Sequence, residues 1–226
     1  MSQLSQIWNG LDWSYLSDLL LSIIPALICI TLHELCHGLT AYALGDDTAK
    51  RAGRLTLNPI RHIDWWGLVM MAICHFGWAK PVPVNMYNFK NPKRGMAITA
   101  LAGPVSNLVI AIVFLFVYGL LYRPLYLGGA IAQAVLQMIG NTAYLSIALA
   151  VFNFIPLPPL DGSKVLFALL PQNAYNKLMR YERYGMIIMV VLIVTGAVSG
   201  GLHTVTYWVY DKLFIFADWG FALVVH

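Results

Sequence analysis

The sequence predicts an all-α polytopic membrane protein, with about four transmembrane helices and a re-entrant or interfacial segment that contains a short β-edge. Hydrophobic residues make up 59% of the 226 residues and charged residues only 11%, whereas about a quarter of the residues in soluble proteins are charged. Several apolar stretches also reach the roughly 20 residues that a helix needs to cross a bilayer. We therefore expect one integral membrane domain over residues 1–226, with its core at about residues 19–170 and a fourth span and tail at residues 184–226.

Four segments have the length and composition of membrane spans. They are Leu19–Leu44, Met96–Leu121, Ile131–Phe154 and Tyr184 to about Tyr210. The first is followed by Gly45-Asp46-Asp47, which is a polar helix-stop signal. Two further apolar segments, Trp65–Trp78 and the tail Leu213–His226, are short for a span; the former suits a re-entrant or interfacial position, and the sequence leaves open whether the tail spans the membrane or lies on it. Residues 1–18 contain no lysine or arginine, so we expect no cleavable signal peptide.

The distribution of basic residues predicts the orientation of these spans. Basic residues crowd the connection between the first two spans and follow the third span, whereas Arg123 lies at the opposite end of the second span. By the positive-inside rule, the two basic connections are cytoplasmic. The net charge of +4 therefore comes from loops that flank the spans, and it does not indicate nucleic-acid binding. The three cysteines, Cys29, Cys36 and Cys74, have apolar neighbours and no CxxC spacing, which indicates buried thiols.

A metal-binding pattern, His33-Glu34-Leu35-Cys36-His37, lies inside the first span. Positions i and i+4 share one face of a helix, so both imidazoles can bind one zinc ion, and Glu34 can act as general base on a water molecule. A carboxylate at this depth is unfavourable unless it has a chemical role. The alternative is a chance pattern on a packed helix with two satisfied histidines. His37 precedes Gly45 by eight residues, or about 12 Å along a helix, which puts the metal within the membrane but nearer its cytoplasmic face.

A third ligand is required, because catalytic zinc keeps three protein ligands and one open position. Asp161 is the candidate, since it follows the third span, which returns to the cytoplasmic side. The prolines at 156, 158 and 159 prevent a regular helix before it. The alternative is that Asp161 is a turn residue or the N-cap of a short helix over Ser163–Leu170.

A candidate for substrate binding lies at Trp78–Asn85. Pro81 and Pro83 favour extended backbone and confine a strand to the edge of a sheet. Such an edge can pair with an unwound stretch of a substrate, which makes Trp78, Lys80, Val82 and Val84 candidate contact residues. The alternative is an ordinary cytoplasmic loop. His62, in the same connection, is more consistent with a surface or hydrogen-bonding role than with a role in the site.

Two motifs together resemble those of the site-2 protease family of intramembrane zinc metalloproteases. They are His33-Glu34-x-x-His37 and Asn153-x-x-Pro156-x-x-x-Leu160-Asp161-Gly162. Further stretches resemble its compact prokaryotic branch, namely Gly53–Pro59, His62-Ile63-Asp64, Gly77–Asn85 and Ala102-Gly103-Pro104-x-x-Asn107. The chain departs from many family members because it has no insertion long enough for a PDZ domain and has Trp65-Trp66 where a proline is expected.

The resemblance implies a function for each motif. It implies one Zn²⁺ per chain, held by His33, His37 and Asp161, with Glu34 as the catalytic base and Asn153 lining the substrate site. It implies an endopeptidase of a prokaryotic cell membrane that cleaves transmembrane proteins within or near their spans, as in regulated intramembrane proteolysis. Its partners would be these substrates and the lipid bilayer, and the sequence leaves homo-oligomerisation open. The alternative is a non-proteolytic zinc-binding membrane carrier or scaffold, against which Glu34 argues because zinc binding alone does not require it.

Overall fold

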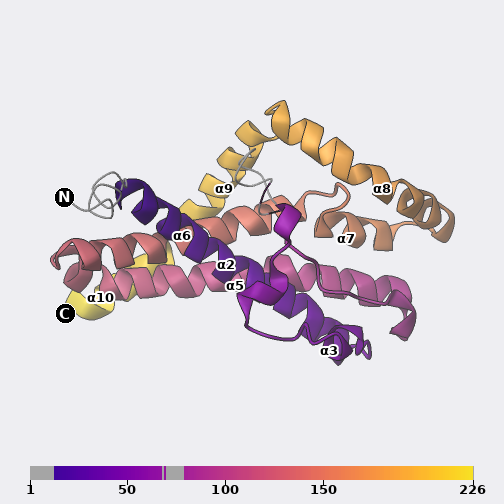
Figure 1. Cartoon of the computed structure of the whole chain (residues 1–226), viewed down its shortest axis with the longest axis horizontal. Helices are drawn as coiled ribbons and strands as arrows, with labels where there is room; N and C mark the ends of the chain where they lie inside the picture. The colour runs from indigo at the N-terminus through magenta and orange to yellow at the C-terminus, as the bar shows by residue number, and fades with distance from the viewer. Residues whose placement is uncertain (1–12, 68, 70–78, 226) are drawn as a thin grey trace, which may run out of the picture.

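The chain folds almost entirely into helices (Figure 1), and the computed structural model describes residues 13–67, 69 and 79–225. Within these residues, three helices are long and apolar enough to cross a membrane: α2 (Trp13–Ala43), α5 (Pro92–Tyr126) and α6 (Ala130–Phe154). They coincide with the first three predicted spans. The all-α class of the fold and the membrane character of the chain are therefore confirmed.

The three spanning helices pack together through small residues. α5 and α6 lie antiparallel, and α2 crosses them obliquely (Figure 1). α5 carries a row of buried residues four positions apart, whose middle part lies against α2 and whose two ends lie against Phe89 and α10 (Ile215–Val225); the row is Gly95, Thr99, Gly103, Asn107, Ala111, Leu115 and Gly119. Small side chains at such spacing let helix backbones approach closely, which is how spanning helices associate without a hydrophobic driving force. This stripe brings the middle of α5 against α2.

Local sequence determines where the spanning helices begin and end. α5 starts after Asn91, whose side chain accepts a hydrogen bond from the Arg94 N–H, and Pro92 occupies the first helical position. α2 ends at Gly45, which has a φ of 104°. The N–H of Asp46 then donates to the carbonyl of Ala41 at 2.9 Å, which is the bond of a Schellman cap. The predicted stop signal after the first span is confirmed.

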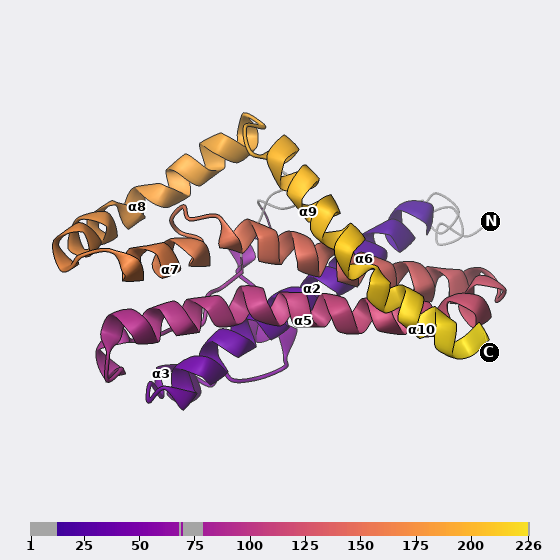
Figure 2. The ribbon, with the colours of Figure 1, turned by 180° about the vertical axis from the view of Figure 1, so that it is seen from behind.

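The fourth predicted span, Tyr184 to about Tyr210, is not one continuous helix. The chain forms α8 (Gln172–Val194), α9 (Ser199–Leu213) and α10 (Ile215–Val225) instead. The physical reason is Gly196, which adopts a φ of 70° and ends α8 with the Ala197 N–H donating to the Leu192 carbonyl. Figure 2 shows α8 and α9 meeting at an angle, after which α9 runs back across α6 and α10 lies along α5.

Short elements fill the connections between the long helices. They are α3 (Thr48–Arg51), the 3-10 helices η1 (Pro59–His62) and η2 (Met86–Asn88), and α7 (Asp161–Leu169). The predicted re-entrant segment Trp65–Trp78 lies largely outside the described residues. The predicted β-edge is reduced, in its described part, to extended backbone with one antiparallel bridge between Ile63 and Ala79. Proline at 81 and 83 removes the amide donors that a longer ladder would need.

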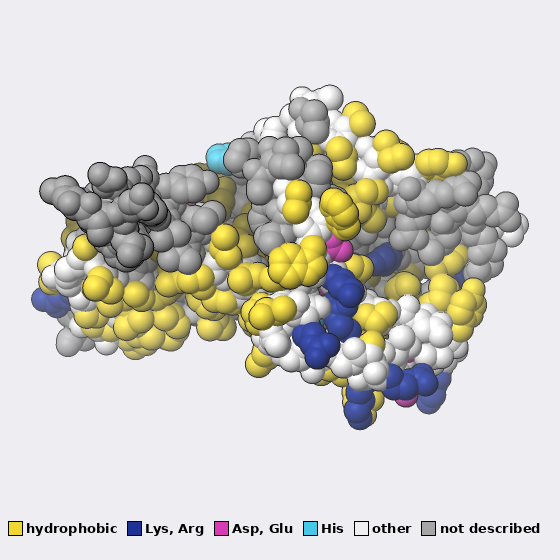
Figure 3. Space-filling model, in the orientation of Figure 1, with side chains coloured by type: hydrophobic (Ala, Val, Ile, Leu, Met, Phe, Trp, Pro, Cys, Tyr) yellow, Lys and Arg dark blue, Asp and Glu magenta, His cyan; other side chains and the backbone are white. Residues whose placement is uncertain are grey.

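Hydrophobic and basic side chains occupy different parts of the molecular surface. Hydrophobic side chains cover the face over α5 and α6, and basic side chains gather at the other end, around α3 and the segment after it (Figure 3). Large apolar side chains such as Ile98, Val105, Val109 and Val113 point outward from α5, as expected for a helix whose surroundings are lipid. The basic end is the end that the sequence predicts to be cytoplasmic.

Candidate metal centre

Three side chains from two distant parts of the chain converge between α2, α5 and α7. His33 and His37 lie one turn apart on α2, and Asp161 is the first residue of α7. The Nε2 atoms of the two histidines are 3.0 Å apart, and they lie 3.2 and 3.1 Å from Oδ2 of Asp161. All three residues are buried. Among the described residues, this is the one group of histidine, cysteine and acidic side chains that could hold a metal ion.

The geometry of this group fits a zinc ion. Zinc–ligand bonds of about 2.0 to 2.1 Å in a tetrahedron separate the ligand atoms by roughly 3.3 Å, close to the spacing seen here. The other ring nitrogen of each histidine is already engaged. Nδ1 of His37 contacts the Thr99 carbonyl at 2.7 Å, and Nδ1 of His33 contacts the Asn107 amide at 3.1 Å. Both imidazoles therefore direct Nε2, their remaining ligand atom, toward Asp161.

The carboxylate of Asp161 is suited to bind a cation. Burial would raise the pKa of Asp161, but the contacts with His33 and His37 outweigh it and hold the pKa below its usual range. The Lys164 ammonium, 3.6 Å from Oδ1, adds to the lowering. The side chain is therefore ionised at neutral pH, as metal ligation requires. The N-cap of α7 is Leu160, and Asp161 is the first residue of the helix itself, so the N-cap role considered as an alternative for Asp161 is not the one seen.

Glu34 lies beside this group and is held in place by the segment at residues 79–84. Its Oε2 atom accepts a hydrogen bond of 2.8 Å from the backbone N–H of Val82. Its other oxygen has no protein partner among the described residues. The structure thus fixes the direction of the Glu34 side chain and leaves one carboxylate oxygen available in the space that the metal ligands also face.

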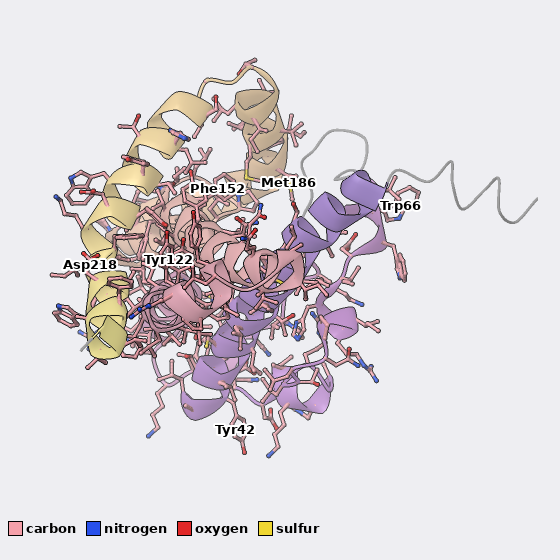
Figure 4. The ribbon with its side chains drawn as sticks, turned by 90° about the vertical axis from the view of Figure 1, so that its left-hand side faces the viewer. Tyr42, Trp66, Tyr122, Phe152, Met186 and Asp218 are labelled. Carbon is pink, nitrogen blue, oxygen red and sulfur yellow. The ribbon has the colours of Figure 1, made fainter. Side chains whose placement is uncertain are left out.

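These residues line a common cleft of about 570 Å³. One wall is the extended segment at residues 79–84, and another is formed by α6 and α8, which contribute Phe152 and Met186, both labelled in Figure 4. The apolar lining includes Ile30, Met96, Leu149, Phe152, Met186 and Met189. The polar groups are the metal-binding triad, Glu34, Thr99, Asn153 and Lys164. A mostly apolar cleft with a few converging polar groups is typical of an active site.

The predicted substrate-contact residues are distributed unevenly around the cleft. Val82 and Val84 line it. Asn153 also lines it, and its Nδ2 donates to the Leu149 carbonyl in its own helix. The Lys80 side chain is exposed and is not part of the lining, while Trp78 lies outside the described residues.

The structure gives His62 a buried hydrogen-bonding role. Its ring is 1% exposed and Nε2 contacts the Thr56 carbonyl. Its own carbonyl accepts from the Lys80 N–H at 2.9 Å. His62 thus supports the start of the cleft wall from behind and does not line the cleft.

Two buried charged residues that sequence reasoning did not identify hold the same wall in place. Asp46 accepts hydrogen bonds from the backbone N–H groups of Thr48 and Asn85 and from the side chain of Asn88. Arg54, 7% exposed, donates to the Lys80 carbonyl at 2.7 Å. Both stand in a polar connection, where charged residues are normally exposed. Asp46 directly follows the helix-stop glycine, which was the one available signal.

Comparison with known proteins agrees with this site. A sequence profile described as peptidase family M50 matches residues 121–196, which include Asp161. YwhC from Bacillus subtilis, which carries the name of a zinc metalloprotease, is 40% identical over 76% of this chain and 80% of its own length. Rip2 from Mycolicibacterium smegmatis, with the same kind of name, is 30% identical over 88% of this chain and 76% of its own. MJ0611 from Methanocaldococcus jannaschii, similarly named, is 32% identical over 68% of this chain and 75% of its own.

No solved structure matches the chain significantly. The relatives nevertheless cover 68 to 88% of this chain, and they share the metalloprotease name. A zinc cofactor is therefore supported both by these relatives and by the cluster of His33, His37 and Asp161. The chain belongs to peptidase family M50, the site-2 proteases, and is a zinc metallopeptidase of the membrane.

Proposed function

We propose that this protein is an intramembrane zinc endopeptidase, which hydrolyses peptide bonds within or near the transmembrane segments of other membrane proteins. His33, His37 and Asp161 hold one zinc ion, and Glu34 is the general base. Regulated intramembrane proteolysis, in which such a cut releases a part of a membrane protein, is the process that this activity serves. The proposal places the protein in a prokaryotic cell membrane, with its site nearer the cytoplasmic face.

The observation that carries the proposal is the position of the metal-binding group within the spanning helices. His33 and His37 lie in the span Leu21–Ala43, well inside its ends. The side chains of His33, His37 and Glu34 face a cleft between helices, and the rest of its lining is mainly apolar. A charged group at this depth is unfavourable without a function, and this one has the parts of a hydrolase. A substrate that reaches these residues lies at the depth of the membrane.

The chemistry follows from the positions of the side chains. A zinc ion at the triad supplies Lewis acidity and lowers the pKa of a bound water to about 7. Glu34 takes the proton of the attacking water on the carboxylate oxygen that Val82 leaves unpaired, and it returns that proton to the leaving amine. Asp161, ionised at neutral pH, adds negative charge beside the two neutral imidazoles and so balances the charge of the metal.

The extended segment at residues 79–84 is the proposed binding edge for the substrate. A peptide bond inside a helix is shielded, so the scissile segment must unwind and gain new backbone partners. Val82 and Val84 line the cleft, and the Val84 N–H has no hydrogen-bond partner among the described residues. Pro81 and Pro83 have no N–H to offer. Val84 therefore offers an amide donor on this wall without a hydrogen-bond partner among the described residues.

The proposal is tested by cleavage in a reconstituted membrane. The purified protein is placed in liposomes with single-span substrates, one set carrying helix-destabilising residues in the span and a matched set carrying leucines there. We expect cleavage of the first set within the span, loss of cleavage with a zinc chelator, and its return when zinc is added. Glu34→Gln is the inactive control. Zinc binding without cleavage of any substrate would instead favour a zinc-binding carrier or scaffold.

A further inference from the structure

Three residues of α5 pack against the two histidines. Thr99, Gly103 and Asn107 follow one another at intervals of four on one face of that helix, and all three are buried. A Cβ atom on Gly103 would lie 2.4 Å from Nε2 of His37 and 2.5 Å from Cε1 of His33. No side chain fits there, so both imidazoles rest directly on the backbone of α5.

Thr99 and Asn107, the first and last of these three residues, contact one histidine each. The backbone carbonyl of Thr99 contacts Nδ1 of His37 at 2.7 Å. The side-chain amide of Asn107 contacts Nδ1 of His33 at 3.1 Å. A backbone carbonyl can only accept a hydrogen bond, so His37 carries a proton on Nδ1, and Nε2 is the nitrogen that can bind the metal. At His33 the corresponding position is occupied by the side-chain amide of Asn107, which has both a donor and an acceptor atom.

Asn107 is itself held with little freedom. It is fully buried at 0% exposure, and its backbone carbonyl accepts a hydrogen bond of 2.8 Å from Ser146 Oγ on α6. Its side chain reaches His33 on α2. One residue thus joins the three spanning helices at the level of the metal centre.

The amide group of Asn107 has two orientations, with opposite consequences for His33. In the structure the amide nitrogen faces His33, and the amide oxygen is then buried without a partner among the described residues. With the oxygen toward His33, the amide oxygen accepts a hydrogen bond from the Nδ1–H group, and Nε2 is left free to bind a cation. A bound metal selects the second orientation, because a metal-ligating nitrogen cannot carry a proton.

We propose that Asn107 is a positioning residue of the zinc site, whose amide oxygen fixes the tautomer and orientation of His33. The inference rests on the proposed function, in that it takes His33 as a zinc ligand. A partner of this kind raises the basicity of the ligating imidazole, and its loss typically weakens metal affinity by about 10- to 100-fold. We therefore expect zinc affinity to depend on the side-chain oxygen of Asn107 and not on its side-chain nitrogen.

The test compares two near-isosteric variants of opposite chemistry. Asn107→Asp keeps an acceptor oxygen beside Nδ1, and Asn107→Leu removes it. Zinc affinity is measured by competition with a chromophoric chelator, and the Co²⁺-substituted proteins report ligand geometry through their d–d absorption. We expect Asn107→Leu to bind zinc about 10- to 100-fold more weakly, and Asn107→Asp to bind it as tightly as the wild type or more tightly, with an unaltered cobalt spectrum.

Matched variants separate this role from a structural one. Asn141→Ala removes another amide contact between α6 and α2, the bond from Nδ2 to the Leu21 carbonyl, away from the metal, and should leave zinc affinity unchanged. Asn107→Ala checks the result if the leucine variant does not fold. Wild-type affinity in folded Asn107→Leu or Asn107→Ala, or equal losses in the aspartate and leucine variants, would overturn the inference.

His33→Ala distinguishes this inference from the proposed function. If His33→Ala loses zinc while folded Asn107→Leu keeps it, only the role of Asn107 is wrong. If His33→Ala keeps full zinc affinity, the assignment of the ligands is wrong and the inference falls with it.

Discussion

The backbone N–H of Val82 donates a hydrogen bond of 2.8 Å to the Oε2 atom of Glu34. This bond joins the proposed catalytic base on α2 to the wall along which a substrate would bind. A carboxylate with one oxygen fixed and the other free is oriented before any substrate arrives, which is how preorganised sites avoid rearrangement during the reaction. The segment at residues 79–84 therefore has two proposed roles. Val82 orients Glu34, and Val84 provides a backbone N–H that can bind a substrate.

The two amides of this wall should respond differently to proline. Val82→Pro removes the donor to Glu34, so we expect kcat to fall by at least tenfold for every substrate, short peptides included, with zinc content unchanged. Val84→Pro removes only the free amide, so it should raise KM for membrane substrates more than it lowers kcat. Val82→Ile and Val84→Ile keep both amides and serve as controls. Steady-state kinetics on a membrane substrate and a short peptide will distinguish these effects, and equal tolerance of both prolines would reduce the segment to an ordinary loop.

Asp46 anchors the far end of the same wall and should contribute to stability. Burial would raise the pKa of Asp46, but hydrogen bonds from Thr48, Asn85 and Asn88 outweigh it and lower the pKa below its ordinary value. Asp46→Asn replaces an acceptor-only group with one that must also donate, and we expect it to lower the free energy of unfolding by roughly 1 to 3 kcal/mol at pH 7. Asp47→Asn is the control, since its exposed ion pair with Arg51 contributes about 0 to 1 kcal/mol.

The effect of Asp46 should depend on pH in a defined direction. Because the folded pKa of Asp46 is lowered, the carboxylate stabilises the fold fully above the unfolded pKa of about 3.9, and this stabilisation is lost as the pH falls below that value and through the lower folded pKa. The difference in Tm between the wild type and Asp46→Asn should therefore shrink between pH 7 and about pH 3. Thermal unfolding in detergent at several pH values measures it. A difference that grew on acidification would contradict the assigned hydrogen bonds.

The orientation in the membrane can be checked at two exposed positions. Lys50 and Arg123 lie near opposite ends of the spanning bundle, and both side chains are exposed. In a variant without the cysteines at 29, 36 and 74, we expect Lys50→Cys to react with a membrane-impermeant thiol reagent only after the cells are opened. Arg123→Cys should react in intact cells. Labelling in the reverse pattern would place the metal centre nearer the outer face.

Some parts of the fold and site followed from the sequence because they depend on local patterns. The first three spans are long and apolar, and His33 and His37 share a helix face by spacing alone. The end of α2 at Gly45 was likewise a local signal. The break at Gly196 was not, because glycine also occurs within spanning helices. Only the positive φ at this residue distinguishes the two cases.

Other parts depended on contacts between distant segments, which local patterns do not encode. Asp161 reaches the histidines because α7 folds back against α5, so the residues alone left an N-cap as an equal alternative. The hydrogen bond between Val82 and Glu34 joins positions 48 residues apart. Asp46, which the sequence indicated only as part of a helix-stop signal, and Arg54 support the cleft wall through hydrogen bonds to residues 39 and 26 positions further along the chain.

Glu34 and Asp161 have separate roles in the proposed mechanism, one as the base and one as a metal ligand, and the zinc content of two purified variants tests this division. Elemental analysis by mass spectrometry gives zinc per chain for the wild type, Glu34→Gln and Asp161→Ala. We expect about one zinc per chain in the wild type and in the inactive Glu34→Gln variant, because the base activates water without holding the metal. Asp161→Ala should lose both zinc and activity. An Asp161→Ala variant with full zinc and full activity, or a Glu34→Gln variant that still cleaves, would contradict the account.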